Sequence, residues 1–179
     1  MKRSNIMGIG IVGTLVLIIL ASGCISSPTT DTKTFSDGAM SFNYPDNFVD
    51  ITEQGNSNSS SSSWQDMVKL GNNNLLCMQV ILVGNNEGET SPAEVRDNGV
   101  LKVKKQPRGE ILSTTTETNT YGILVEKSTY KQDSVFGMVV YNDMFFKING
   151  VVYAISVYGP DSNKQQIMET ANIVFQSIK

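Results

Sequence analysis

The sequence predicts an α+β domain with a central antiparallel β-sheet, flanking helices and an amphipathic C-terminal helix packed on the sheet. Three observations predict this fold class. Apolar runs with the periodicity of strands follow one another across short turns, one internal segment carries the signals of a helix start, and the C-terminal segment places apolar residues three and four positions apart. Of the 179 residues, 40% are apolar and 17% are charged, which excludes a disordered chain and one embedded in a membrane throughout.

Three strands are predicted ahead of the first helix. Residues 40–45 alternate between apolar and polar side chains, which is the pattern of a strand with one buried face. A second strand is expected over residues 64–70 and a third over residues 75–83. The run 75–83 is apolar at odd and even positions, which is typical of a strand covered on both faces. We therefore expect Cys77 to be a small, buried side chain.

A helix is predicted from Ser91 to about Lys105. Ser91 is a good cap residue, Pro92 suits the first helical position, and Glu94 stands three residues after the cap. Together these residues satisfy the free amides of a helix start. Pro107 ends the helix because proline cannot continue it.

Four strands and a closing helix complete the predicted domain. The strands are expected over residues 111–120, 123–131, 135–148 and 151–158. The last two flank Asn149-Gly150, a strong hairpin signal because both turn residues accept positive φ. The strand 111–120 is rich in threonine and is expected to face solvent. The closing helix begins near Asp161 or Ser162, and its apolar face is formed by Ile167, Ala171, Val174, Phe175 and Ile178.

The opening of this domain resembles that of the PsbP-like (PsbP/Mog1-type) fold. The resemblance is carried by Phe35-Ser36-Asp37-Gly38, then by Met40-Ser41-Phe42-Asn43-Tyr44-Pro45, and then by Phe48. It implies an aromatic-rich hairpin, a central antiparallel sheet and a terminal helix. Known members are binding proteins: one docks on a photosystem and helps it retain ions, and a nuclear relative binds a small GTPase. Docking of the photosystem subunit depends on an N-terminal arm and on features that include a histidine. This chain has a Ser/Thr spacer and no histidine, so no docking residue carries over and a photosynthetic role is not implied.

The first 23 residues have the pattern of an export signal. Lys2 and Arg3 precede an uncharged run from Ile6 to Ala21, whose length as a helix is about 24 Å, short of the ~30 Å hydrocarbon core. The run ends in Ala-Ser-Gly before Cys24, which resembles the lipobox of prokaryotic lipoproteins, including those of archaea. The resemblance implies cleavage before Cys24 and a lipid on its sulfur. An uncleaved anchor helix is the alternative.

The predicted organisation is therefore a signal peptide (1–23), a lipidated cysteine with a flexible spacer (24–33) and a PsbP-like domain (34–179). The expected location is the extracytoplasmic face of the cell membrane. A polar, serine-rich loop is expected over residues 55–63, where Asn58 fits a glycosylation sequon. Removal of the signal changes the net charge from −3 to −5, because two cations and no acids are lost. Such a charge argues against a nucleic-acid partner.

The sequence offers little catalytic chemistry. Histidine is absent and only two cysteines are present, which excludes histidine triads and a disulfide scaffold. The Gly-x-Gly-x-x-Gly pattern of dinucleotide-binding folds occurs at residues 8–13. It lies inside the export signal with no strand before it, so it does not indicate a nucleotide site. Some acids could bind a cation but are expected to be ordinary turn residues: Asp46, Asp50, Glu53, Glu87 and Glu89. The basic residues near the end of the first helix are expected to form a solvated face: Lys102, Lys104, Lys105 and Arg108.

We therefore expect a membrane-anchored, non-catalytic binding or adaptor domain without a metal or cofactor. Its expected partners are the membrane, through the lipid, and an envelope protein of unknown identity. Trp64 is the candidate partner contact, whereas most other aromatic residues of the strands are expected to be core. A small-ligand carrier with a cleft between sheet and helices is the alternative. A second alternative is a secreted hydrolase that works without histidine. Such an enzyme would need two or more carboxylates converging in a pocket.

Overall fold

The computed structural model describes residues 31–52, 64–83, 91–135 and 137–179. The predictions for the signal peptide, Cys24, the serine-rich loop, Asn58, Glu53, Glu87 and Glu89 lie outside these residues. In the described part of the chain, neither helix has the length and apolar character needed to cross a bilayer.

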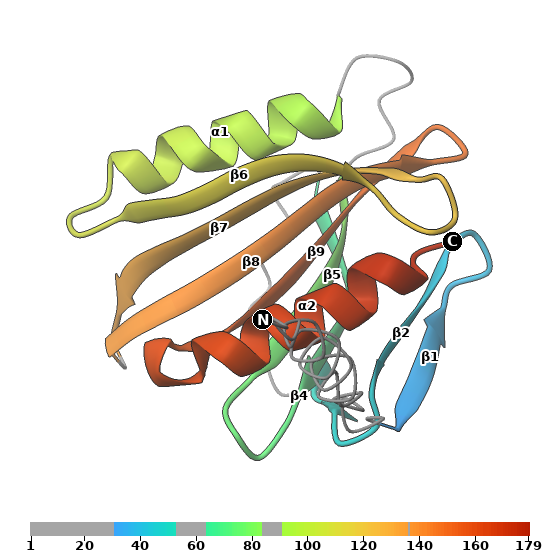
Figure 1. Cartoon of the computed structure of the whole chain (residues 1–179), viewed down its shortest axis with the longest axis horizontal. Helices are drawn as coiled ribbons and strands as arrows, with labels where there is room; N and C mark the ends of the chain where they lie inside the picture. Colours follow the sequence, from blue (N-terminus) through green and yellow to red (C-terminus); the bar gives the residue numbers. More distant parts are fainter. Residues whose placement is uncertain (1–30, 53–63, 84–90, 136) are drawn as a thin grey trace, which may run out of the picture. The chain divides into compact units, whose positions relative to one another are not determined.

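The described residues form the predicted α+β domain (Figure 1). Its first five strands are β1 (Thr32–Ser36), β2 (Ser41–Pro45), β3 (Val49–Asp50), β4 (Trp64–Gly71) and β5 (Cys77–Val83). Helix α1 (Pro92–Lys104) follows, and then come β6 (Glu110–Thr118), β7 (Leu124–Ser134), β8 (Gly137–Ile148) and β9 (Val151–Pro160). A short 3₁₀ turn, η3 (Asp161–Asn163), leads into α2 (Lys164–Ser177).

Seven strands form one antiparallel sheet in the order β3-β4-β5-β9-β8-β7-β6, and β1 pairs with β2 in a separate hairpin. The chain leaves the sheet after β5, runs through α1 and re-enters at the far edge with β6. It then returns strand by strand until β9 pairs with β5. Because β9 lies at the centre of the sheet, it is protected on both edges by its neighbours.

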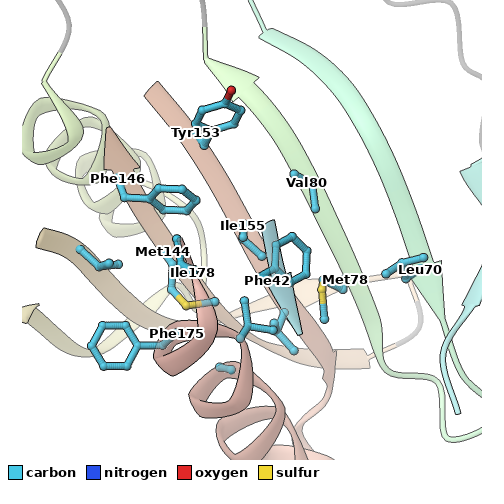
Figure 2. Packing of buried hydrophobic residues seen from close by; sticks show 14 of the residues in the cluster. Phe42, Leu70, Met78, Val80, Met144, Phe146, Tyr153, Ile155, Phe175 and Ile178 are labelled. Carbon is cyan, nitrogen blue, oxygen red and sulfur yellow. The ribbon is translucent and has the colours of Figure 1, made fainter. Parts of the chain in front are cut away.

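The main core lies between the sheet and α2 (Figure 2). Strand residues that alternate along β8 and β9, including Met144, Phe146 and Ile155, pack with Phe175 and Ile178 near the end of the chain. Burial of such side chains stabilises the fold by roughly 1.5–3 kcal/mol each. The β1–β2 hairpin and the residues that follow it add further core side chains, Met40, Phe42 and Phe48, with Phe35 and Tyr44 packed against the core. The predicted apolar face of the closing helix is confirmed, since all five of its residues are buried.

The local signals of helix and turn are also confirmed. The Ser91 hydroxyl accepts a hydrogen bond from the backbone of Glu94, whose carboxylate accepts one from the backbone of Ser91 in return. At the β8–β9 hairpin, Asn149 and Gly150 have φ angles of 50° and 84°. These positive values allow a two-residue turn to join tightly twisted strands.

Two details of the strand predicted over residues 75–83 are wrong. The strand begins at Cys77 rather than at residue 75, because the Asn72 side chain accepts hydrogen bonds from the backbone of Asn74 and Leu76 and closes a turn. Leu75 lies in this turn with a φ of 61° and is 70% exposed. Cys77 is only partly buried, because its side chain points to the face of the sheet away from the main core.

Asn119 joins the β6–β7 turn to the end of α2. Its side-chain amide donates hydrogen bonds to the carbonyls of Phe175 and Ile178, at 3.1 and 2.7 Å. Its side-chain oxygen accepts hydrogen bonds from the backbone of Tyr121 and Ile123. One buried side chain therefore satisfies the turn and two carbonyls at the helix end, where backbone groups lack partners within the helix.

Candidate functional site

Helix α1 covers the second face of the sheet, and its contact with that face is incomplete at the centre. Val95, Gly99 and Val103 lie four residues apart, so they share one side of the helix. Val95 and Val103 are buried. A Cβ atom built on Gly99 would meet no heavy atom within 4 Å. The helix is therefore held at both ends of this stripe and leaves open space beneath its middle.

A partly buried ion pair fixes the first half of α1. The Arg96 guanidinium donates a hydrogen bond to the Glu126 carboxylate of β7 and another to the Thr116 hydroxyl of β6. The Thr116 hydroxyl also donates to Glu126, at 2.7 Å. Since Arg96 and Glu126 expose only 16% and 9% of their side chains, this pair sets the position of the helix over the sheet.

The space beneath α1 is a pocket of about 660 Å³, which we call the α1 pocket. This volume lies within the range of about 300–1,000 Å³ that is typical of small-molecule sites. One end is apolar and belongs to a small core cluster of Val83, Val95, Phe145, Val152 and Ala154, with Ile81 packed against it. The other end is polar, and the residues that matter there are Tyr130, Tyr141, Tyr158, Asp143, Ser156 and Lys102.

Three tyrosines form a ladder across the floor of the pocket. Tyr130, Tyr141 and Tyr158 are directly opposite one another on β7, β8 and β9. Their ring centroids are 5.0 and 5.2 Å apart, with interplanar angles of 8° and 17°. Burial is the main cause that raises the pKa of Tyr130 above its usual range and that of Tyr158 to about 12. The ladder thus provides a rigid floor, because each ring is fixed by its neighbour.

Asp143 is the only carboxylate among the described residues that line the α1 pocket. It is partly buried. Its two oxygens accept hydrogen bonds from the hydroxyls of Ser156, at 2.6 Å, and Tyr130, at 3.0 Å. Burial raises the pKa of this carboxyl to about 6, although both hydrogen bonds act in the opposite direction. Within the described part of the chain, no lysine or arginine forms an ion pair with it.

Several polar groups of the pocket have no hydrogen-bond partner among the described side chains and backbone. They are the Tyr141 hydroxyl on the floor and the side chains of Asn98, Lys102, Gln106 and Gln132 around the opening. Such groups are available to a bound molecule. The arrangement can therefore hold a ligand with a polar part near Asp143 and an apolar part near Phe145.

Of the residues singled out in the sequence, Lys102 lines this pocket, whereas Trp64, Asp46 and Asp50 do not. Trp64 is the first residue of β4, where it pairs with Val83, and its role as a partner contact stays a prediction. Asp50, the last residue of β3, accepts hydrogen bonds from the backbone and hydroxyl of Thr52, which lower its pKa, so it makes a local hydrogen bond to the backbone. Within the residues that the structure describes, no three metal-ligating side chains come together. Lys102 and Lys104 lie in the last turn of α1, as predicted.

The pocket could not be located from the sequence, although one signal pointed to it. Asp143 stands in a strand that is otherwise rich in apolar and aromatic residues, on the same side as Tyr141 and Phe145. A carboxylate among apolar strand residues must be paired or hydrogen-bonded to be tolerated there. Of the aromatic residues expected to be core, Phe145, Phe146 and Tyr153 are buried, whereas Tyr141 and Tyr158 are only partly buried. Both of the latter line the pocket.

Solved structures that share this fold include proteins of a mycobacterium, a cyanobacterium and a pseudomonad. LpqN of Mycobacterium tuberculosis, described as involved in cell envelope biogenesis, is 14% identical with a TM-score of 0.56, over 83% of this chain and 90% of LpqN. Cyanobacterial PsbP (CyanoP) from Synechocystis sp. PCC 6803 is 11% identical with a TM-score of 0.58, over 89% and 98% of the two chains. PA94 of Pseudomonas aeruginosa, a protein of unknown function, is 9% identical with a TM-score of 0.51, over 81% and 94%.

Sequence comparison finds no relative: no family model matches the chain, and no curated protein does so. The likeness is therefore one of fold. The described domain has a PsbP-like α+β fold.

Proposed function

We propose that this chain is a non-catalytic binding domain held at the extracytoplasmic face of the membrane by a lipid on Cys24, and that it binds a small ligand in the α1 pocket. The observation that carries the proposal is the open space of about 660 Å³ beneath Gly99. A helix that only had to cover the sheet would be expected to fill its central position with an apolar side chain.

Binding is favoured over catalysis by the composition of the pocket. A hydrolase without histidine would need converging carboxylates, and the described lining holds one, Asp143. The nearby Ser156 hydroxyl donates a hydrogen bond to that carboxylate, but the described lining holds no second carboxylate to work with it. We therefore assign the hydroxyls of Ser156 and Tyr130 the role of orienting Asp143 toward a ligand.

The pocket favours a small ligand over a protein partner. Large exposed apolar side chains of the described residues are distributed over several elements, whereas partner surfaces usually gather aromatic anchors in one patch. These side chains are Val49, Leu75, Leu101, Tyr121, Leu124, Val135 and Met168. The α1 pocket is lined by polar and apolar side chains, so the ligand it suits has polar groups as well as an apolar part.

Location in the envelope is supported by two independent features. The sequence ends its export signal with a lipobox-like Ala-Ser-Gly-Cys at residues 21–24, and one protein with the same fold, LpqN, is described as involved in cell envelope biogenesis. A lipid on Cys24 would hold the domain at the bilayer, since each buried methylene contributes about 0.8 kcal/mol.

Membrane fractionation tests the anchoring. The intact mass of the membrane-extracted protein should show a mature chain that begins at a lipid-modified Cys24. The variant Cys24→Ser should lose the lipid and leave the membrane fraction, while Cys77→Ser, the matched control, should stay bound. A wild-type chain that retains residues 1–23, or one found in the cytosol, would contradict the proposed anchoring.

A melting experiment tests the pocket. Small molecules extracted from the cell envelope should raise the Tm of the wild-type protein and of Gly99→Ala. They should not raise the Tm of Gly99→Leu, whose side chain fills the space beneath α1. An equal rise in all three proteins would place the binding outside the α1 pocket.

A further inference from the structure

We infer that the α1 pocket takes an organic ammonium, with its cationic head on Asp143 and an apolar body at the Phe145 end. This inference rests on the proposed function, because it names the class of ligand for the proposed binding site.

Asp143 differs from the other acids on this sheet that are partly or fully buried. The carboxylates of Glu117 and Glu126 each have a cationic partner, Lys127 and Arg96 respectively. Asp143 has none among the described residues, and its only partners are two hydroxyl groups. Because a partly buried carboxylate is costly unless it is paired, the missing partner is expected to come from a ligand.

The carboxylate has room for such a partner. An ionised carboxylate offers about four lone-pair sites, and the hydroxyls of Tyr130 and Ser156 occupy two of them. An ammonium group could donate to the remaining sites. The Tyr141 hydroxyl, which lines the same pocket and has no partner in the described part of the chain, offers a further acceptor.

The body of the ligand is indicated by the opposite end of the pocket. Phe145 lies two residues from Asp143 on β8 and therefore on the same face, and it packs in one buried cluster with Val95 and Ala154. An ammonium bound at Asp143 would thus have apolar surface about 7 Å away along β8. A molecule with a cationic head and an apolar body matches both ends.

Other ligand classes fit less well. A metal ion such as Ca²⁺ needs six to eight oxygen ligands, and the described lining holds one carboxylate. An anionic ligand would fit less well because it would lie beside the carboxylate of Asp143. The best cationic partner for such an anion would be Lys102, which is an exposed residue of the lining.

Three matched probes distinguish these classes: 4-phenylbutylammonium, 4-phenylbutanol and 4-phenylbutyrate. They share one apolar body and differ in the charge of the head. Binding to the full chain in lipid nanodiscs would be measured by calorimetry at about pH 7.5, where amine and acid are both charged. Empty nanodiscs serve as the blank.

The ammonium should bind about tenfold more tightly than the alcohol, as a charge-assisted hydrogen bond requires, and the carboxylate should bind most weakly. Asp143→Asn should reduce the preference for the ammonium over the alcohol to about twofold or less. Lys102→Gln, the control for the opposite charge, should preserve the order of the three probes. Gly99→Leu should abolish binding of all three probes, because its side chain fills the space beneath α1.

Three results would overturn the inference. The first is tightest binding of the carboxylate with loss of that binding in Lys102→Gln. The second is an ammonium affinity that Asp143→Asn leaves unchanged. The third is equal binding of all probes that is lost in Gly99→Leu, which would reject the ammonium but retain the pocket as a binding site. If no probe binds, the ammonium class is rejected, and the melting experiment with envelope extract decides the proposed function separately.

Discussion

Asp143 is the residue on which the chemistry of the pocket depends. Its pKa is raised to about 6 by burial, so between about pH 4 and pH 6 the folded protein binds more protons than the unfolded chain. The free energy of unfolding therefore decreases as the pH rises through this window. Among the described residues of the pocket lining, Asp143 is the only carboxylate.

The variant Asp143→Asn tests this account. Since asparagine does not titrate, the variant should lose the decrease in the free energy of unfolding between about pH 4 and pH 6 that this carboxyl causes. Relative to wild type, the variant should become more stable as the pH rises to about 7. Urea denaturation at several pH values measures the difference. Parallel pH profiles for the two proteins would show that this carboxyl has an ordinary pKa.

Two glycines near α1 should respond to alanine in opposite ways. Gly99→Ala should stabilise the protein by about 0.5–1 kcal/mol, because alanine is the better helix former and the new methyl group meets open space. Gly109→Ala should destabilise it, because the new Cβ would lie 2.1 Å from the Val103 carbonyl oxygen. Thermal denaturation measures both changes. Destabilisation by Gly99→Ala would mean that the space beneath α1 is closed.

At the scale of elements, the ion pair between Arg96 and Glu126 should fix α1 to the sheet. Arg96→Met removes the cation and leaves a buried carboxylate, which should cost roughly 2–4 kcal/mol. Arg108→Met provides the control, because the pair of Arg108 with Asp133 is exposed and such pairs contribute about 0–1 kcal/mol. Urea denaturation compares the two variants. Equal, small effects would show that Arg96 does not hold the helix in place.

The C-terminal helix should depend in the same way on Asn119. Asn119→Ala removes four hydrogen bonds and leaves buried backbone groups without partners, so the expected cost is roughly 2–4 kcal/mol. Thr120→Val is the control, since it removes one hydrogen bond, to Gln176, at an exposed site. Hydrogen exchange of α2 should increase in the first variant and not in the second. Unchanged exchange in both would contradict the role given to Asn119.

Prediction from sequence succeeded where the determinants are local. The cap formed by Ser91 and Glu94, the turn at Asn149-Gly150 and the apolar face of α2 each depend on residues a few positions apart. The pocket depends instead on register across three strands, which brings Tyr130, Tyr141 and Tyr158 into one row. Nothing in the local sequence specifies that β5 lies beside β9 or that α1 covers this face of the sheet, so the position of the row beneath α1 could not be predicted.

At the scale of the whole domain, one face of the sheet forms the main core and the other face lines the α1 pocket. The face covered by α2 and the β1–β2 hairpin buries a continuous apolar core that holds the domain together. The face covered by α1 carries a polar row, a small apolar cluster and open space between sheet and helix. A domain organised in this way can bind a ligand on one face without disturbing its core on the other.

Native mass spectrometry of the protein purified from its own membranes tests the central claim most directly. The wild-type protein and Gly99→Ala should carry a non-covalent small molecule in addition to the mass of the covalent lipid, and Gly99→Leu should carry the lipid alone. A wild-type protein without any bound molecule, or a Gly99→Leu protein that retains it, would contradict the assignment of the α1 pocket as the binding site.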